Sequence, residues 1–133
     1  MVWQGHHMTR AATIAQMTIR VSGLLLILLG LAIWTGRADQ VVPIHELLGF
    51  VLVLALWALS FFAARAGISM SWVVLAVAWG LAAPILGLTQ QNLVTGDWHW
   101  TIQVLHLLIG AGAIGQGENL ALRMRQLGSP RAT

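Results

Sequence analysis

Four long hydrophobic runs constrain this sequence more than any other feature. They cover approximately residues 19–35, 44–64, 71–88 and 101–120. A helix needs about 20 mainly apolar residues to cross the hydrocarbon core of a bilayer, and each run is close to that length. Only 8% of the residues are charged, whereas soluble domains are roughly 25% charged. The runs therefore predict a single all-α domain over residues 1–133, an integral membrane four-helix bundle with up-and-down connections.

The arginines predict how this bundle is oriented. All seven basic residues are arginines, and in the four-span arrangement only Arg37 lies on the side opposite to the other six. Because basic residues are enriched on the cytoplasmic side of membrane proteins, both chain ends are expected in the cytoplasm. The bacterial cytoplasmic membrane is the expected location. The arginines are dispersed between apolar runs, so they indicate topology in a lipid bilayer and not a surface for nucleic acid.

Histidine is the strongest metal ligand that this composition offers. The chain has no cysteine, which excludes thiolate metal sites, disulfides and thiol nucleophiles. Three of the five histidines, His6, His7 and His99, lie outside the hydrophobic runs, whereas His45 and His106 lie inside the second and fourth. Those two runs cross in the same direction, so both imidazoles are expected in the outer half of the bilayer at comparable depth. An imidazole at that depth is costly unless it has a partner.

Each of these two histidines is followed four residues later by a glycine. The pairs are His45 with Gly49 and His106 with Gly110. Residues four apart share one face of a helix, so a patch without side chains lies one turn further into the membrane from each imidazole. The first and third runs also carry a glycine at this depth. The pattern predicts an apolar cavity at the level of the histidines, into which a flat ring could fit.

Two facing imidazoles in an apolar slot resemble the small bacterial four-helix membrane cytochromes b, in which histidines of the second and fourth helices hold a haem. The resemblance implies one haem b per chain, with His45 and His106 as its axial iron ligands and with Gly49 and Gly110 beside the macrocycle. It also implies relay of single electrons near the outer face, with a quinone, a periplasmic redox protein or a small oxidant as partner. Whether the chain is also an enzyme stays open.

The resemblance extends to the surroundings of the haem. Its propionates would favour a cation at the outer rim, where Arg37 is the candidate. His99 lies seven residues before His106 and hence on its face, so it is a candidate for a propionate contact or an alternative ligand. Gln103 could orient the ring of His106 through a hydrogen bond.

The larger family members hold a second haem about four turns further along each helix. This chain has Leu59 or Ser60 and Asn119 or Leu120 at those positions. None of these is a haem ligand, so a single haem is expected.

Other interpretations of the same residues remain open. The two imidazoles could hydrogen-bond backbone carbonyls or each other between helices, bind another metal, or form a proton path with Glu46. Glycines also mediate close helix packing in membranes without any cofactor. The chain could therefore be a cofactor-free structural or accessory subunit of a larger membrane complex, or form a homo-oligomer. A small multidrug exporter is disfavoured because the first run contains no acidic residue.

Overall fold

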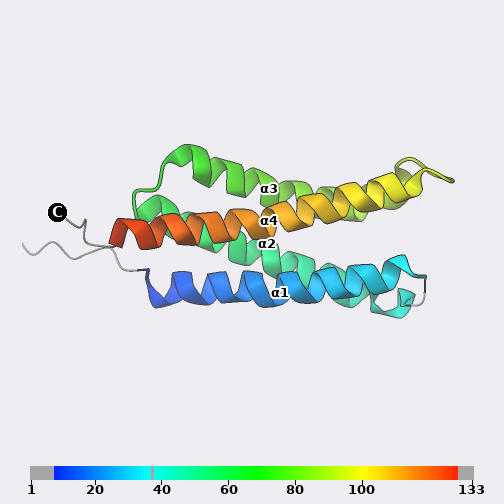
Figure 1. Cartoon of the computed structure of the whole chain (residues 1–133), viewed down its shortest axis with the longest axis horizontal. Helices are drawn as coiled ribbons and strands as arrows, with labels where there is room; N and C mark the ends of the chain where they lie inside the picture. The colour runs from blue at the N-terminus through cyan, green and yellow to red at the C-terminus, as the bar shows by residue number, and fades with distance from the viewer. Residues whose placement is uncertain (1–7, 37, 129–133) are drawn as a thin grey trace, which may run out of the picture.

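The computed structural model describes residues 8–36 and 38–128. It contains four α-helices, and two of the three connections include a turn of 3-10 helix (Figure 1). In chain order the elements are α1 (Arg10–Trp34), η1 (Asp39–Val41), α2 (Val42–Arg65), α3 (Met70–Thr89), η2 (Gln90–Asn92) and α4 (His99–Gly128). The predicted all-α fold of four helices is confirmed.

Local sequence signals explain where the helices begin and end. The Thr9 side chain caps α1 by accepting a hydrogen bond of 3.1 Å from the backbone N–H of Ala12, as expected of an N-cap threonine. Pro43 lies in the first turn of α2, where its missing N–H costs nothing. Gly36 follows α1 and Gly67 follows α2, with φ angles of 68° and 87°. These left-handed conformations favour glycine and reverse the chain.

The first and last helices, α1 and α4, are longer than their hydrophobic runs. α1 begins at Arg10 instead of about residue 19, and α4 continues to Gly128 instead of ending near residue 120. The bounds of α2 and α3 agree with the prediction to within two residues. Hydropathy marks only the most apolar part of a helix, whereas capping and backbone hydrogen bonds carry the helix on into more polar sequence.

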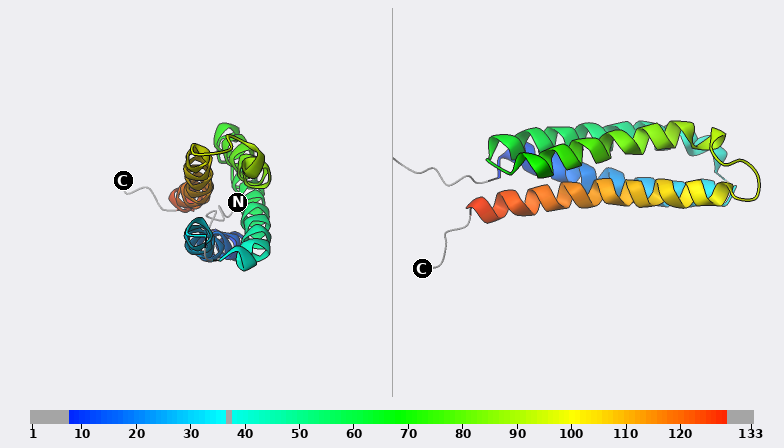
Figure 2. Two further views of the ribbon diagram at one scale, coloured as in Figure 1. Left: turned by 90° about the vertical axis from the view of Figure 1, so that its right-hand side faces the viewer. Right: turned by 90° about the horizontal axis from the view of Figure 1, so that it is seen from above.

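The helices run alternately up and down, so the two ends of the described chain lie at the same end of the bundle (Figures 1 and 2). We call this the terminal end and the opposite one the loop end. Each helix packs against the next, and α4 also packs against α1 and α2. Within the described chain the backbones of α1 and α3 do not approach each other closely. The parallel helices α2 and α4 are therefore the diagonal pair in contact.

Buried side chains are confined to the half of the bundle at the terminal end. This terminal half comprises residues 8–23, 52–80 and 113–128. Its core contains Ile19, Leu56, Leu59 and Leu120, none of which has any exposed surface. Helices α1 and α4 come close together beside this core, because a methyl group added at Gly117 would lie 2.9 Å from Ile19 Cδ1. The terminal half has the dense interior expected of a folded protein.

The other half of the bundle has no buried residue among those described. This loop half comprises residues 24–36, 38–51 and 81–112. All four helices continue into it, yet every described side chain in it is partly or fully accessible. The loop half is consequently where a site can lie.

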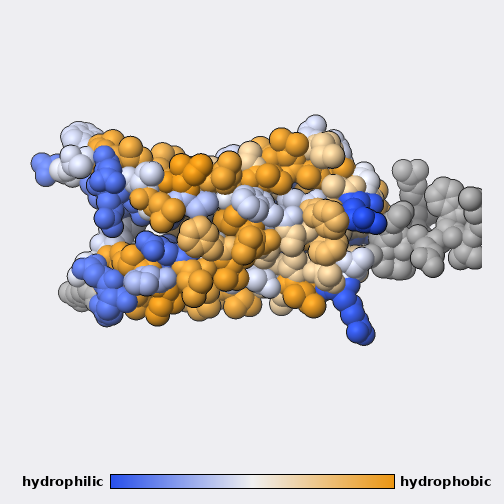
Figure 3. All heavy atoms as spheres, turned by 180° about the vertical axis from the view of Figure 1, so that it is seen from behind, coloured by the Kyte–Doolittle hydropathy of each residue, from blue (hydrophilic) through white to orange (hydrophobic). Residues whose placement is uncertain are grey.

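In the described part of the chain, three segments are long and apolar enough to cross a membrane. They are Arg10–Trp34, Asp39–Arg65 and Met70–Asn92. Figure 3 shows an apolar belt between two more hydrophilic ends. The prediction of an integral membrane protein thus holds for three helices by length and composition. The fourth, α4, is more polar, because its 30 residues include Gln103, His106, Gln116 and Glu118.

Candidate functional site

A cavity of about 220 Å³ lies in the loop half and is lined by residues of all four helices. Most of its wall is apolar, with Leu26, Ile27, Phe50 and Leu107 among the lining residues. The cavity predicted at the level of the histidines is present.

His45 and His106 both line this cavity. His45 lies in the first turn of α2, and His106 lies two turns into α4. Their ring centroids are 6.2 Å apart and their ring planes are inclined by 52°. The expectation that the two imidazoles come together at one level is confirmed by this geometry.

Each imidazole is seated on a glycine of the helix next to its own. A methyl group added at Gly30 of α1 would lie 3.2 Å from Cε1 of His45, and one added at Gly87 of α3 would lie 2.9 Å from Cε1 of His106. Such distances are tighter than ordinary carbon contacts, so any larger residue would press on the ring. The α1–α2 hairpin and the α3–α4 hairpin thus each present one histidine against one glycine.

The glycines one turn below the histidines play a different part. Gly49 and Gly110 line the cavity, and a methyl group at either position would meet no atom within 4 Å. They leave the cavity wall without side chains, as the sequence pattern predicted.

Neither imidazole makes a hydrogen bond within the described part of the chain. Nδ1 of His45 and Nδ1 of His106 are both buried without a partner. A buried polar atom left without a partner typically costs about 1–3 kcal/mol, and such atoms are uncommon in native structures. The hydrogen bonds expected if the histidines served only to join helices are not present among the described residues, which leaves both rings available for another ligand.

Polar side chains line the cavity from three of the elements around it. Glu46 follows His45, Gln103 lies one turn before His106, and Gln90 and Gln91 form part of η2. The last two were not singled out from the sequence, because η2 is formed only where α3 meets its connection to α4. Gln103 lines the cavity as expected, but it makes no hydrogen bond to His106 in the described structure.

His99, which was also singled out from the sequence, does not contribute to the cavity wall. His99 is not among the lining residues, and its Nδ1 lies 3.4 Å from the backbone oxygen of Leu93. The sharing of a helix face with His106 is therefore insufficient to bring it to the site. Arg37 lies outside the described residues.

The cavity ends where the terminal half begins. A methyl group at Gly23 would lie 2.6 Å from Cδ1 of Ile114 and 3.5 Å from Cδ1 of Leu52, so α1, α2 and α4 converge there. Below this floor Leu59, Ser60 and Leu120 are essentially fully buried. The level about four turns beyond the histidines, where the larger cytochromes b hold a second haem, is packed with side chains in this chain.

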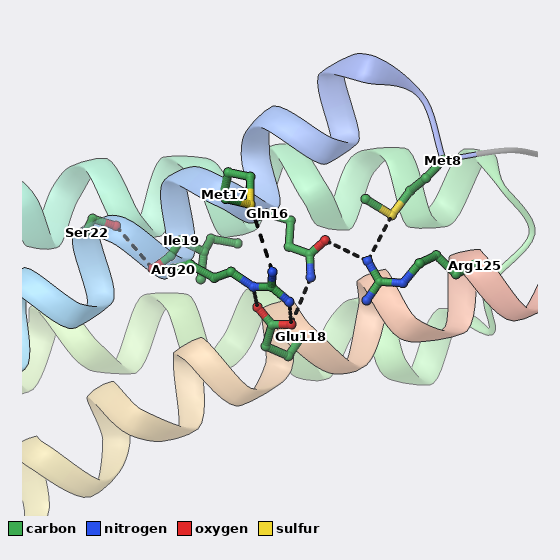
Figure 4. A network of polar contacts seen from close by, with 8 residues as sticks. All are labelled: Met8, Gln16, Met17, Ile19, Arg20, Ser22, Glu118 and Arg125. Carbon is green, nitrogen blue, oxygen red and sulfur yellow. Dashed lines mark hydrogen bonds and ion pairs between the residues drawn. The ribbon is translucent and has the colours of Figure 1, made fainter.

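A polar network joins α1 to α4 in the terminal half (Figure 4). Glu118 accepts hydrogen bonds of 2.6 and 2.7 Å from Arg20 and one of 2.8 Å from the buried Gln16. Arg125 donates to the side-chain oxygen of Gln16 at 2.9 Å. Sequence analysis missed this network, although a lone charge in each of two otherwise apolar stretches was its signal.

The donor atoms at the cavity limit which metal could bind. No group of three or more histidine, aspartate or glutamate side chains suited to a metal ion occurs among the described residues. Zinc requires three or four protein ligands, whereas haem iron needs protein ligands only in axial positions.

Comparison with known proteins identifies no relative: no family model matches the sequence, and no curated protein or solved structure is significantly similar to it. The functional argument consequently depends on the site.

Proposed function

We propose that the cavity binds one haem b, with His45 and His106 as its axial ligands, and that the chain is a membrane cytochrome that relays single electrons. One observation carries the proposal. Two imidazoles that have no hydrogen-bond partner among the described residues, one from each helical hairpin, face one cavity with their centroids 6.2 Å apart.

This separation fits two ligands of one metal. Bonds from a metal to an imidazole nitrogen are about 2 Å long, so the centroids of two imidazoles on opposite sides of a metal lie roughly 6 Å apart. An angle of 52° between the ring planes is compatible with such ligation, since each ring can turn about its own bond to the metal.

The lining of the cavity also suits a flat, apolar ring system. Gly49 and Gly110 remove side chains from the wall beside the histidines, and hydrocarbon side chains form most of the remainder. Interiors of folded proteins are normally close-packed. The described loop half has no buried residue, whereas the terminal half has a buried core, and this difference supports a fold in which a cofactor completes the core of the loop half.

The chemistry of the site then divides between cofactor and protein. Haem held between two imidazoles takes up and releases one electron at a time, at a potential tuned by its ligands and surroundings. His45 and His106 would hold the iron from two different hairpins, and the apolar wall would limit the access of water. Gln103 lies one turn from His106, where its amide could accept or donate a hydrogen bond at the edge of the site.

The proposal includes an orientation in the membrane. Arg10, Arg65, Arg123 and Arg125 lie towards the terminal end, so the positive-inside rule would place that end in the cytoplasm. The haem would then lie near the outer face of a bacterial cytoplasmic membrane, with α4 as a fourth span enclosed by its contacts with the other three. Electrons would be exchanged at the loop end with a quinone, a periplasmic redox protein or a small oxidant.

A cofactor-free structural subunit is the alternative, and the packing of α4 weakens it. Of the small residues that could form a docking face, Gly112 and Gly117 are covered by side chains of this chain, and Ala113 is buried. Gly110 lines the cavity. Gly115 alone among these is exposed with nothing within 4 Å, which is a small surface for a partner helix.

An absorption spectrum of the protein purified from haem-replete cells tests the proposal. A strong Soret band with six-coordinate, low-spin b-type spectra in both redox states is expected, at one haem per chain. Colourless protein that remains colourless after incubation with hemin in detergent would sink the proposal. Haem-free protein that co-purifies stoichiometrically with another membrane protein would favour the structural subunit.

A further inference from the structure

Two tryptophans, each near the middle of its helix, make matching contacts with the next helix along the chain. The first is Trp57 of α2, whose indole Nε1 donates a hydrogen bond of 3.3 Å to the backbone oxygen of Val77 in α3. The indole lies against Gly80, where an added methyl group would be 2.8 Å from Nε1. Glycine is therefore needed for this approach.

The second is Trp79 of α3, which repeats the arrangement on α4. Its Nε1 donates a hydrogen bond of 2.8 Å to the backbone oxygen of Ile109. A methyl group added at Gly112 would overlap the indole. In both cases the accepting carbonyl lies three residues before the glycine that makes room for the ring.

These contacts tie α3 to both helices that carry the histidines. A helical carbonyl has a second lone pair that can accept the indole N–H in addition to its own backbone bond. Hydrogen bonds of this kind between membrane helices are each worth roughly 0.6–2 kcal/mol. Ile109 lies one turn from His106 and directly before the cavity-lining Gly110, so the Trp79 contact fixes α4 at the level of the cavity.

We infer that Trp57 and Trp79 are positioning residues that set the separation of His45 and His106 through α3. The inference rests on the proposed function for its consequence on haem, but the separation of α2 from α4 can be measured without haem. Trp79 has the larger role, because its hydrogen bond is shorter and closer to the site.

The experiment uses the absence of cysteine from the native chain. Leu47 and Leu108 each lie two residues after a histidine and are 64% and 62% exposed. Cysteines at these two positions accept spin labels, and pulsed dipolar spectroscopy then gives the α2–α4 distance distribution in haem-free protein. Trp79→Phe keeps an aromatic ring but removes the donor. Trp98→Phe is the matched control, since Trp98 is 67% exposed and lies outside the helices.

We expect Trp79→Phe to broaden or shift the distribution and Trp98→Phe to leave it unchanged. In haem-loaded protein, Trp79→Phe should speed haem loss about 3- to 30-fold, the factor that corresponds to one such hydrogen bond, and should alter the low-spin electron paramagnetic resonance signal. A purely structural role would lower the melting temperature without changing that signal or the distances. An unchanged distribution in folded Trp79→Phe protein overturns the inference.

Trp57→Phe provides a second test if the Trp79 variant does not assemble. Its longer hydrogen bond predicts a smaller change of the same kind, and no change would again overturn the inference. A wild-type protein that binds no haem would remove the proposed function, while the label distances would still decide whether the tryptophans position the two helices.

Discussion

The two halves of the bundle are made by the same four helices, yet their glycines face different neighbours. In the terminal half, Gly117 admits the side chain of Ile19, and the core around it is fully buried. In the loop half, Gly30 and Gly87 seat imidazoles, and Gly110 faces a cavity. Glycine by itself therefore does not distinguish a helix contact from a site. The side chain on the neighbouring helix decides which of the two is formed.

The packed half shows that the hollow half is not the result of a generally loose fold. Leu56, at the centre of the terminal half, contacts the positions of both Gly80 and Gly117 and has no exposed surface. The helices pack closely in the terminal half, so we infer that particular residues of the loop half keep them from packing equally closely there. The comparison can be tested in each half.

Removing either histidine should have the largest effect. His45→Ala or His106→Ala takes away one of the two proposed axial ligands, so purified protein should lose its low-spin haem spectrum almost completely. His99→Ala is the control, because His99 does not line the cavity. Equal haem content in all three variants would contradict the assignment of the ligands.

Filling the loop half should exclude haem and stabilise the haem-free protein. In Gly110→Leu the new side chain enters the cavity, while the helix gains roughly 1 kcal/mol of propensity. Haem content should fall sharply, and the melting temperature of the haem-free protein should rise. Gly115→Leu supplies the matched control with the same gain in propensity on an exposed surface, and it should leave haem binding intact.

A cavity made in the terminal half should act in the opposite direction. Leu56→Ala removes a fully buried side chain, which commonly costs about 2–5 kcal/mol. The free energy of unfolding, measured by titration with a denaturing detergent, should fall by a similar amount with and without haem. Leu54 is 62% exposed, so Leu54→Ala should change the free energy of unfolding only a little. Equal tolerance of both alanines would mean that the terminal half is not packed as described.

The smallest effect is expected where the imidazoles meet glycine. Gly87→Ala and Gly30→Ala both place a methyl group against a ring, and such overpacking costs about 1–3 kcal/mol before any gain in helix propensity. The closer contact at Gly87, 2.9 Å against 3.2 Å at Gly30, predicts faster haem loss in Gly87→Ala. A reversed order, measured by transfer of haem to a soluble acceptor, would show that the ring of His106 adjusts more easily.

Sequence periodicity and hydropathy were sufficient for the four helices and for bringing His45 and His106 together, because both depend on spacing along a helix and on the direction of each span. They did not predict that His99 turns towards Leu93, since that depends on the connection between α3 and α4. The contact between Arg20 and Glu118 also escaped, because it joins residues far apart in sequence. Contacts between helices depend on rotation about each helix axis, which hydropathy leaves undetermined when a helix is apolar on most sides.

The seating of each histidine on a glycine of its own hairpin has a consequence for assembly. The α1–α2 hairpin contributes His45 with Gly30, and the α3–α4 hairpin contributes His106 with Gly87. The site is thus the sum of two half-sites of like construction, joined through the turn at Gly67. Any ligand that bridges the two imidazoles also links the two hairpins, so occupancy and tertiary assembly are thermodynamically coupled. If the two hairpins were expressed as separate chains, a ligand that bridges the two imidazoles would hold the hairpins together. It would replace the covalent turn that joins them in the intact molecule.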